Sequence, residues 1–189
     1  MFFFNDTKVS NNAFAPGSST IAYNAVDKGA FSIRFKKESS DSVVAAVPLA
    51  QYDSLHFYTI FIHNLQADGP AEAVRIEDDF SNLVSGKLFY RFFHASPNTG
   101  AVDLYMDNVK MENNRMAADN SNFASFKEFP GSTSGYHTLQ VKVAGSDSVI
   151  ANLTNAELLA GNAYTVYLKG LSGGSGSRGL SLGLLRAAD

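Results

Sequence analysis

The chain has 189 residues, of which 45% are hydrophobic and 17% are charged, and its formal net charge is −3 at pH 7. This composition supports a packed core, and it excludes intrinsic disorder and a basic surface for nucleic acid or anionic lipid. Cysteine is absent, which excludes disulfides, thiolate metal sites and cysteine nucleophiles. No apolar run reaches the ~18 residues of a membrane-spanning helix, so we expect no transmembrane segment and no nucleic-acid partner.

Short apolar or alternating runs, separated by Gly, Asn, Asp and Ser, predict an all-β chain. Phe31, Ile33 and Phe35, for example, alternate with polar residues at the period of a half-buried strand. The strands expected in chain order cover residues 2–4, 21–26, 31–36, 43–47, 57–62, 73–77, 88–93, 101–105, 123–129, 139–143, 149–153, 164–168 and 180–185. One helical turn is expected at residues 155–161, with Asn155 as N-cap and Gly161 after its end.

The second half of the chain repeats the first half. Phe4–Asn12 matches Met106–Asn114 at an offset of 102 residues (106 − 4). The segments that match at an offset of 106 residues (135 − 29) are Gly29–Lys36 with Gly135–Lys142, Asp41–Ala45 with Asp147–Ala151, and Tyr58–Phe61 with Tyr164–Tyr167. Because three separate blocks keep one register, we interpret the chain as two tandem copies of one fold.

We expect each copy to be an immunoglobulin-like antiparallel β-sandwich, because each holds about seven or eight short strands. The first copy covers residues 1–79, a linker covers residues 80–86, and the second copy covers residues 87–189. Residues 89–98 open the second copy and have no counterpart in the first, so the first copy is expected to lack its opening strand. An exposed sheet edge recruits strands; we expect a neighbouring strand, the linker or another molecule there, including a homo-oligomer formed through that edge.

The stretch from Gly86 to Asn98, with residues 101–105 after it, resembles the start of a known domain. The family is catalogued as domain of unknown function 4397, and its members open each copy with a strand, Arg-x-x-His-Ala-Ser-Pro and a Val-Asp-aromatic strand. Residues 160–166 resemble its Gly-x-x-Tyr-Thr-Val strand. The resemblance covers residues 86–188 and reaches the first copy through the repeat. It implies an exported bacterial β-sandwich without established activity, periplasmic or on the outer surface, and a surface lipoprotein whose leader and lipid anchor precede this chain.

The strand that opens the second copy has two apolar faces. Leu88, Tyr90 and Phe92 point to one side, and Phe89, Arg91 and Phe93 point to the other, because side chains alternate along a strand. We expect one face to meet the core of the second copy, and the other to meet the first copy or the linker.

The motif supplies the polar side chains that could carry chemistry, namely Arg91, His94, Ser96 and Asp103, together with Pro97, which would end the strand. We favour a polar latch at the strand end, in which Asp103 meets Arg91 or His94. The alternative is a ligand or metal site at His94 and Asp103, and in that case the protein could be a hydrolase.

Other signals of chemistry are missing. No histidine spacing suits zinc, no Asp-x-Asp-x-Asp loop suits calcium, and no Gly-x-Ser-x-Gly elbow is present. The glycine-rich residues 173–179 lack the Gly-Lys-Ser/Thr of a phosphate-binding loop. We therefore expect no cofactor, no catalytic activity and an unidentified protein partner. A glycan partner is the alternative, bound on a surface platform of tyrosines drawn from Tyr52, Tyr58, Tyr90, Tyr136 and Tyr167.

Overall fold

The computed structural model describes residues 1–10, 13–20, 23–122 and 126–188. Its elements are β1 (Phe2–Phe4), β2 (Thr7–Lys8), β3 (Gly29–Lys36), β4 (Val43–Tyr52), β5 (Phe57–Asn64), β6 (Ala71–Asp78), β7 (Lys87–His94), β8 (Val102–Met106), β9 (Val109–Arg115), η1 (Ala117–Ser121), β10 (Gly131–Thr133), β11 (Gly135–Val143), β12 (Val149–Leu158), β13 (Ala163–Lys169), η3 (Gly176–Arg178) and β14 (Ser181–Ala188). The all-β prediction is confirmed. In the described part of the chain, no helix is long and apolar enough to cross a membrane.

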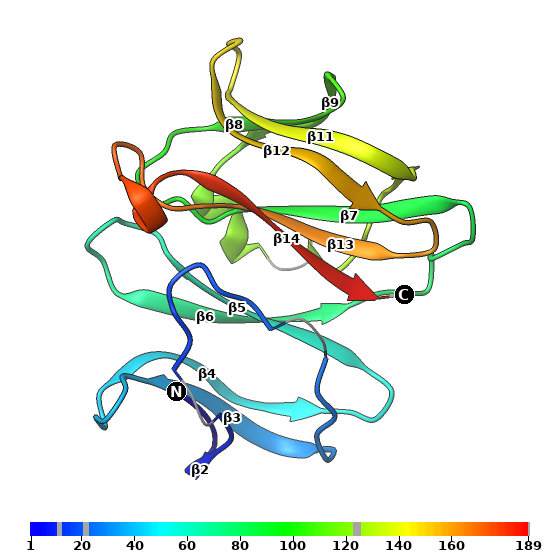
Figure 1. Ribbon diagram of the computed structural model, residues 1–189. Helices are drawn as coiled ribbons and strands as arrows, with labels where there is room; N and C mark the ends of the chain where they lie inside the picture. The colour runs from blue at the N-terminus through cyan, green and yellow to red at the C-terminus, as the bar shows by residue number, and fades with distance from the viewer. Residues whose placement is uncertain (11–12, 21–22, 123–125, 189) are drawn as a thin grey trace.

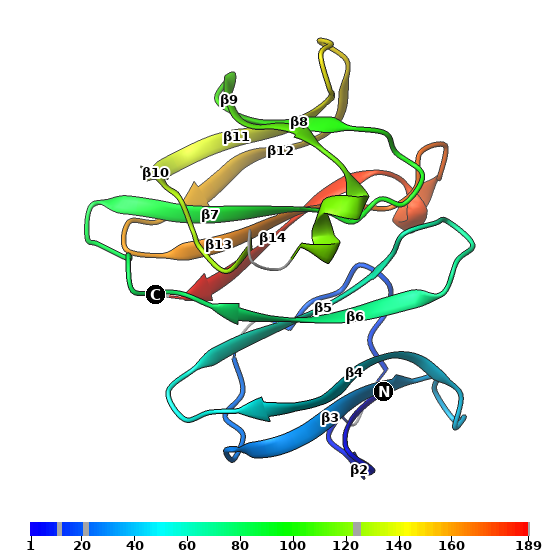
Figure 2. The same cartoon turned by 180° about the vertical axis from the view of Figure 1, so that it is seen from behind.

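The described strands form four sheets that stack as layers (Figure 1). Their strand orders are β12-β11-β8-β9, β10-β7-β13-β14, β5-β6 and β2-β1-β3-β4. Seen from behind, the layers follow one another in the same order, and β10 lies beside β7 (Figure 2). The first two sheets form the second copy, and the last two form the first copy.

The second copy is a complete two-sheet sandwich. Leu88, Tyr90 and Phe92 of β7 pack with Leu104 of β8 and Leu139 of β11 in one buried cluster between the sheets. One pairing departs from the expected antiparallel sandwich: β7 runs parallel to β13, with Phe89 beside Ala163. This is physically allowed because several strands separate the two in sequence, which is the long connection that parallel neighbours need.

The repeat extends to single hydrogen bonds. Asn5 and Asp107 lie at equivalent turns and share a left-handed backbone, with φ of 49° and 48°. The side-chain Oδ1 of Asn5 accepts from the Ser32 amide at 2.9 Å, and that of Asp107 accepts from the Thr138 amide at 2.8 Å. Both outer sheets also carry their bulges at equivalent positions. The two copies therefore fold alike, as the sequence repeat predicts.

The helical turn predicted at residues 155–161 is wrong. β12 continues to Leu158, and Asn155 has φ of 55° where the pairing with β11 shifts register. Asn tolerates this left-handed conformation better than most residues. It therefore serves a β-bulge here instead of capping a helix.

Two predicted strands are not found in the described residues. Residues 21–22 and 123–125 lie outside the described part, and residues 23–26 and 126–129 are not in strands. Of the described aromatic side chains there, Phe126 and Phe129 are buried between the two copies, whereas Tyr23 is exposed. The apolar residues that suggested a strand at 126–129 are therefore explained by packing between the copies and not by a strand.

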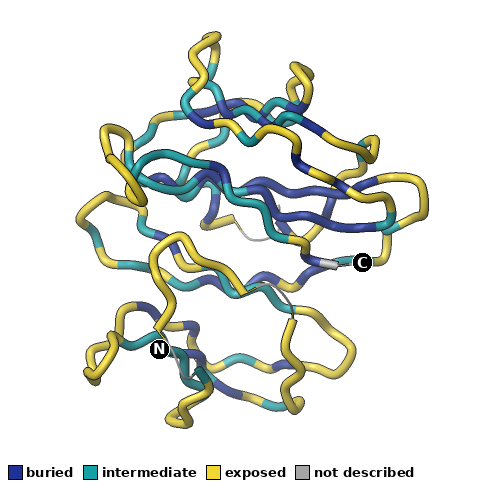
Figure 3. Tube along the Cα trace, in the orientation of Figure 1, coloured by how far each residue is buried: buried dark blue, intermediate teal, exposed yellow. Residues whose placement is uncertain are grey.

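The outer face of β7 packs on the first copy, as predicted. Phe93 joins a buried cluster with Val74 and Ile76 of β6, and Phe89 packs with Phe80 between β6 and β7. Every residue of β7 except the first is buried, and the trace along β7 is correspondingly dark blue (Figure 3). This strand therefore belongs at once to the second sandwich and to the contact between copies.

Candidate functional site: the buried polar groups around β7

Arg91 lies at the contact between the two copies and is only 3% exposed. Its guanidinium forms an ion pair with the fully buried side chain of Asp78 at the end of β6. It also donates to Thr59 Oγ1 of β5 at 2.7 Å, to Thr165 Oγ1 of β13 at 2.9 Å and to the Phe126 carbonyl at 2.9 Å. A buried charge is tolerated when it is both paired and hydrogen-bonded, and this guanidinium meets both conditions.

Aromatic rings and a tyrosine complete the surroundings of this ion pair. The rings of Phe93 and Phe129 lie 5.1 and 4.5 Å from the Arg91 guanidinium carbon, within the range of cation–π contacts. The Tyr23 hydroxyl donates to the Asp78 carboxylate. Burial and the charge of that carboxylate raise the pKa of Tyr23 well above its usual range, so this hydroxyl stays a donor.

His94 and Ser96 form the corner at which β7 ends. His94 is fully buried, its Nε2 lies 3.0 Å from the Gly100 carbonyl, and its Nδ1 accepts from the Ser96 amide at 3.3 Å. Asn120 Nδ2 donates to the His94 carbonyl at 2.7 Å, and the Ser96 and Thr99 hydroxyls lie 2.7 Å apart. The side chains of His94 and Ser96 thus have partners within the chain, whereas the buried Oδ1 of Asn120 has none among the described residues.

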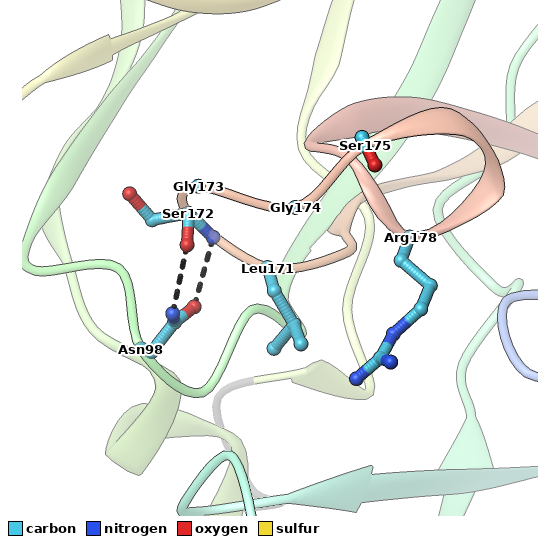
Figure 4. Close-up of a pocket in the computed structure, with 7 residues that line it drawn as sticks. All are labelled: Asn98, Leu171, Ser172, Gly173, Gly174, Ser175 and Arg178. Atoms are coloured by element: carbon cyan, nitrogen blue, oxygen red, sulfur yellow. Dashed lines mark hydrogen bonds between the residues drawn. The ribbon is translucent and has the colours of Figure 1, made fainter.

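Pro97 and Asn98 form the turn after this corner. Asn98 Nδ2 donates to the Ser172 carbonyl at 3.0 Å, and the Ser172 amide donates back to Asn98 Oδ1 at 2.9 Å. These bonds fasten the glycine-rich loop to the turn (Figure 4). A hollow of about 330 Å³ beside them is lined by Arg178 and the loop backbone. Its lining residues include Ser172 and Ser175, but no Asp, Glu or His that could act as an acid or a base beside them.

Asp103 does not meet Arg91 or His94, and that prediction is wrong. Its carboxylate is fully buried, accepts from the Asn114 amide at 2.8 Å and pairs with Lys110 Nζ at 2.7 Å. Val102 and Leu104, its neighbours on β8, face the sandwich core, so Asp103 points to the opposite side, while Arg91 points toward the first copy. Burial pushes the pKa of Asp103 up, but these bonds outweigh it and hold the pKa below its usual range.

The tyrosines do not form a shared platform. Tyr52 and Tyr58 lie in the core of the first copy, with their ring centroids 5.0 Å apart. Tyr90 lies in the core of the second copy, and Tyr167 packs against the cluster between the copies. Tyr136 is 65% exposed and stands apart on β11. Among the described residues, no group of three or more His, Asp or Glu could hold a metal ion.

The hydrogen-bond partners of Arg91 were not predicted from the sequence, although the repeat contains an indication of two of them. Thr59 and Thr165 occupy the same position of the repeat, each directly after an aligned tyrosine. Both hydroxyls bind the one guanidinium from opposite copies. A polar residue recurring in two otherwise apolar strands indicates a shared contact.

Two buried histidines predict a pH dependence of stability. Burial lowers the pKa of both His63 and His94 from the ordinary 6.5. The charge of Glu72 opposes this shift at His63, and backbone hydrogen bonds oppose it at His94, but burial is the larger effect in both. The unfolded chain therefore binds protons below pH 6.5 that the folded chain does not. Stability should fall as pH drops below 6.5, by up to about 1.4 kcal/mol per pH unit for each histidine.

Urea unfolding measured from about pH 7.5 to about pH 5.5, across the range in which histidine titrates, tests this expectation. Neither ring nitrogen of His63 has a hydrogen-bond partner among the described residues, so His63→Leu removes no bond seen there and should reduce the pH dependence. An unchanged dependence in that variant would exclude His63 as its source.

Comparison with known protein families identifies the domain. A family model described as Domain of unknown function (DUF4397) matches the chain twice, over residues 2–105 and 91–182. A search of the curated proteins finds no match. The two matches correspond to two tandem copies, and the residues that they share run from Arg91 to Tyr105.

Proposed function

Because the chain belongs to the DUF4397 family and carries two tandem copies of its domain, we propose that it is a non-catalytic structural or interaction module that works outside the cytoplasm. The opening strand of the second copy serves in it as the joint of a rigid four-layer unit.

The burial of the motif is the observation that carries this proposal. Arg91, His94, Ser96 and Asp103 are each no more than 3% exposed, and each is bonded within the chain. A catalytic acid, base or nucleophile must come within hydrogen-bond reach of a substrate. Groups that are buried and already bonded are better suited to holding strands in place.

The composition supports a location outside the cytoplasm. The chain has no cysteine and few charges, and 12% of its residues are aromatic, a balance typical of exported β-domains. We propose the periplasm or the outer surface as its location.

Protease treatment of intact cells that produce the full-length protein tests this location. The chain should be degraded, or become accessible once only the outer membrane is permeabilised, while a cytoplasmic marker stays intact. Protection until the inner membrane is lysed would contradict the proposal.

The His94→Ala variant separates a structural motif from a binding site. The change opens a cavity and leaves the Ser96 amide without its acceptor, so the unfolding free energy should fall by about 1–3 kcal/mol. Binding measured on a glycan array should be the same for the variant and the parent. Glycan binding lost in His94→Ala, or in Tyr136→Ala, with unchanged melting would favour a carbohydrate-binding protein instead.

A further inference from the structure

His63 of β5 lies at the contact between the two copies, in the layer next to that of β7 and β13 (Figure 1). Two residues before it, the ring of Phe61 stacks on that of Phe93 of β7, with centroids 4.6 Å apart. Four residues before it, Thr59 accepts a hydrogen bond from Arg91 of β7. Because side chains alternate along a strand, His63 points to the same side as Phe61 and Thr59. It is only 3% exposed there, so its ring is enclosed between the copies.

The imidazole of His63 has no acceptor for an added proton. Its ring stacks on that of Phe61, with centroids 5.2 Å apart and planes 16° apart. Both of its nitrogens are buried, and neither has a hydrogen-bond partner among the described residues. A charge taken out of water raises the free energy of the molecule unless it is paired and hydrogen-bonded. Protonation of His63 is therefore unfavourable while the copies are in contact, and it becomes favourable in acid once water reaches the ring.

One nearby charge opposes this effect but does not cancel it. Glu72 pairs with His63 across the β5–β6 ladder, and its carboxylate favours the protonated ring. Burial is the larger effect, and it holds the pKa of His63 below the ordinary 6.5. From β7, the charged residue on the facing side is Arg91, and its guanidinium is already paired with Asp78.

Lys169 of β13 shows what a cation at this position of the repeat requires. It is the equivalent of His63 (169 − 63 = 106), and its Nζ donates to the Gly17 carbonyl at 2.8 Å. A lysine stem is long enough to carry its charge away from an apolar contact. The imidazole is shorter and reaches no such acceptor in the described part of the chain. The first copy thus holds a neutral ring where the second holds a hydrogen-bonded cation.

His94, the other histidine whose pKa burial lowers, does not lie on this contact. It follows Phe92 by two residues, and Phe92 belongs to the core of the second copy, so His94 points into that copy. Its ring nitrogens bond groups of the same copy, at Gly100 and Ser96. Titration of His94 therefore affects the second sandwich and not the contact between the copies.

We propose that the joint between the copies is acid-sensitive: protonation of His63 releases the contact of β5 and β6 with β7, while each sandwich stays folded. Below pH 6.5 the open state binds one proton more than the closed state. Each pH unit below that value should therefore raise the equilibrium constant for opening by up to about tenfold, until the lower pKa of the enclosed ring is reached. This response depends neither on the compartment nor on a ligand, so it stands or falls apart from the proposed role.

Thiol labelling of the full chain, which has no native cysteine, tests the proposal. Val74→Cys places a thiol in the cluster between the copies, at a site 5% exposed. Its labelling rate is followed from about pH 7.5 to about pH 5.5, across the range in which histidine titrates. Dividing it by the rate of Val109→Cys, at a site 63% exposed on β9, corrects for thiol ionisation. The ratio should rise by up to about tenfold for each pH unit below 6.5, and His63→Leu should abolish the rise.

Two controls locate the effect. His56→Leu removes a histidine whose side chain is 48% exposed, and it should leave the rise unchanged. Val47→Cys places the thiol in the core of the first copy, at a site 4% exposed, and it should be labelled more slowly than Val74→Cys at every pH. A ratio that does not change with pH, or the same rise in His63→Leu, would overturn the proposal. Equal labelling of Val47→Cys and Val74→Cys would also overturn it, because the first copy would then unfold instead of the joint opening.

Discussion

Replacing Arg91 with Met should lower the free energy of unfolding by about 3–5 kcal/mol, because it leaves the buried carboxylate of Asp78 without a counter-charge. The change also removes the bonds to Thr59 and Thr165, one from each copy. Urea denaturation followed by tyrosine fluorescence and far-UV circular dichroism measures the loss. Because the guanidinium joins the copies, we expect the variant to unfold in two separated transitions.

The matched control is Arg34→Met, which breaks an ion pair on the surface. Arg34 and Asp6 side chains are 41% and 87% exposed, and exposed pairs contribute at most about 1 kcal/mol. If the Arg91 variant lost no more stability than this control, the ion pair with Asp78 would not hold the copies together.

Truncating either of two adjacent phenylalanines on β7 should cost about 3–5 kcal/mol, because both leave cavities in well-packed surroundings. Phe92 and Phe93 are each 1% exposed, but they point to opposite sides. Phe92→Ala should destabilise the second sandwich, whose core it joins. Phe93→Ala should weaken the contact between copies, where its ring lies 4.6 Å from that of Phe61 and 4.9 Å from that of Phe126.

Hydrogen exchange of the native protein distinguishes the two phenylalanine variants by location. Phe92→Ala should raise exchange mainly in β8 and β11, and Phe93→Ala mainly in β5 and β6. Leu49→Ala, at a site 69% exposed, should change stability by no more than about 0.5 kcal/mol. The same exchange pattern in both phenylalanine variants would contradict the assignment of the two faces.

The two faces of β7 were predictable because strand alternation alone separates Phe92 from Phe93. The repeat likewise predicted the layout of both copies, since equivalent residues make equivalent turns at Asn5 and Asp107. Parallel pairing with β13 was not predictable, since alternation determines which face a residue occupies but not which strand lies beside it.

The partner of Arg91 depends on tertiary packing, which the sequence pattern does not contain. Asp103 follows the motif closely and was the expected acid, but its strand turns it away from the core. Asp78, at the end of the preceding copy, lies on the layer that faces Arg91. Choosing between these acids requires knowing that β7 packs on β6, which depends on how the two copies dock.

The helical turn expected near Asn155 shows a different limit. Asn before a short apolar run and Gly after it are typical of a capped helix. The same residues also tolerate a left-handed backbone, which a β-bulge needs. Only pairing with β11 decides between the two, and that pairing is non-local.

A double-mutant cycle between Arg91 and Asp78 tests most directly whether β7 is the joint between the copies. The cycle compares Arg91→Met, Asp78→Leu and the double variant by urea denaturation. We predict a coupling free energy above about 2 kcal/mol, with the double variant more stable than either single variant. A coupling near zero, equal to that of the exposed pair Arg34 and Asp6, would contradict the account.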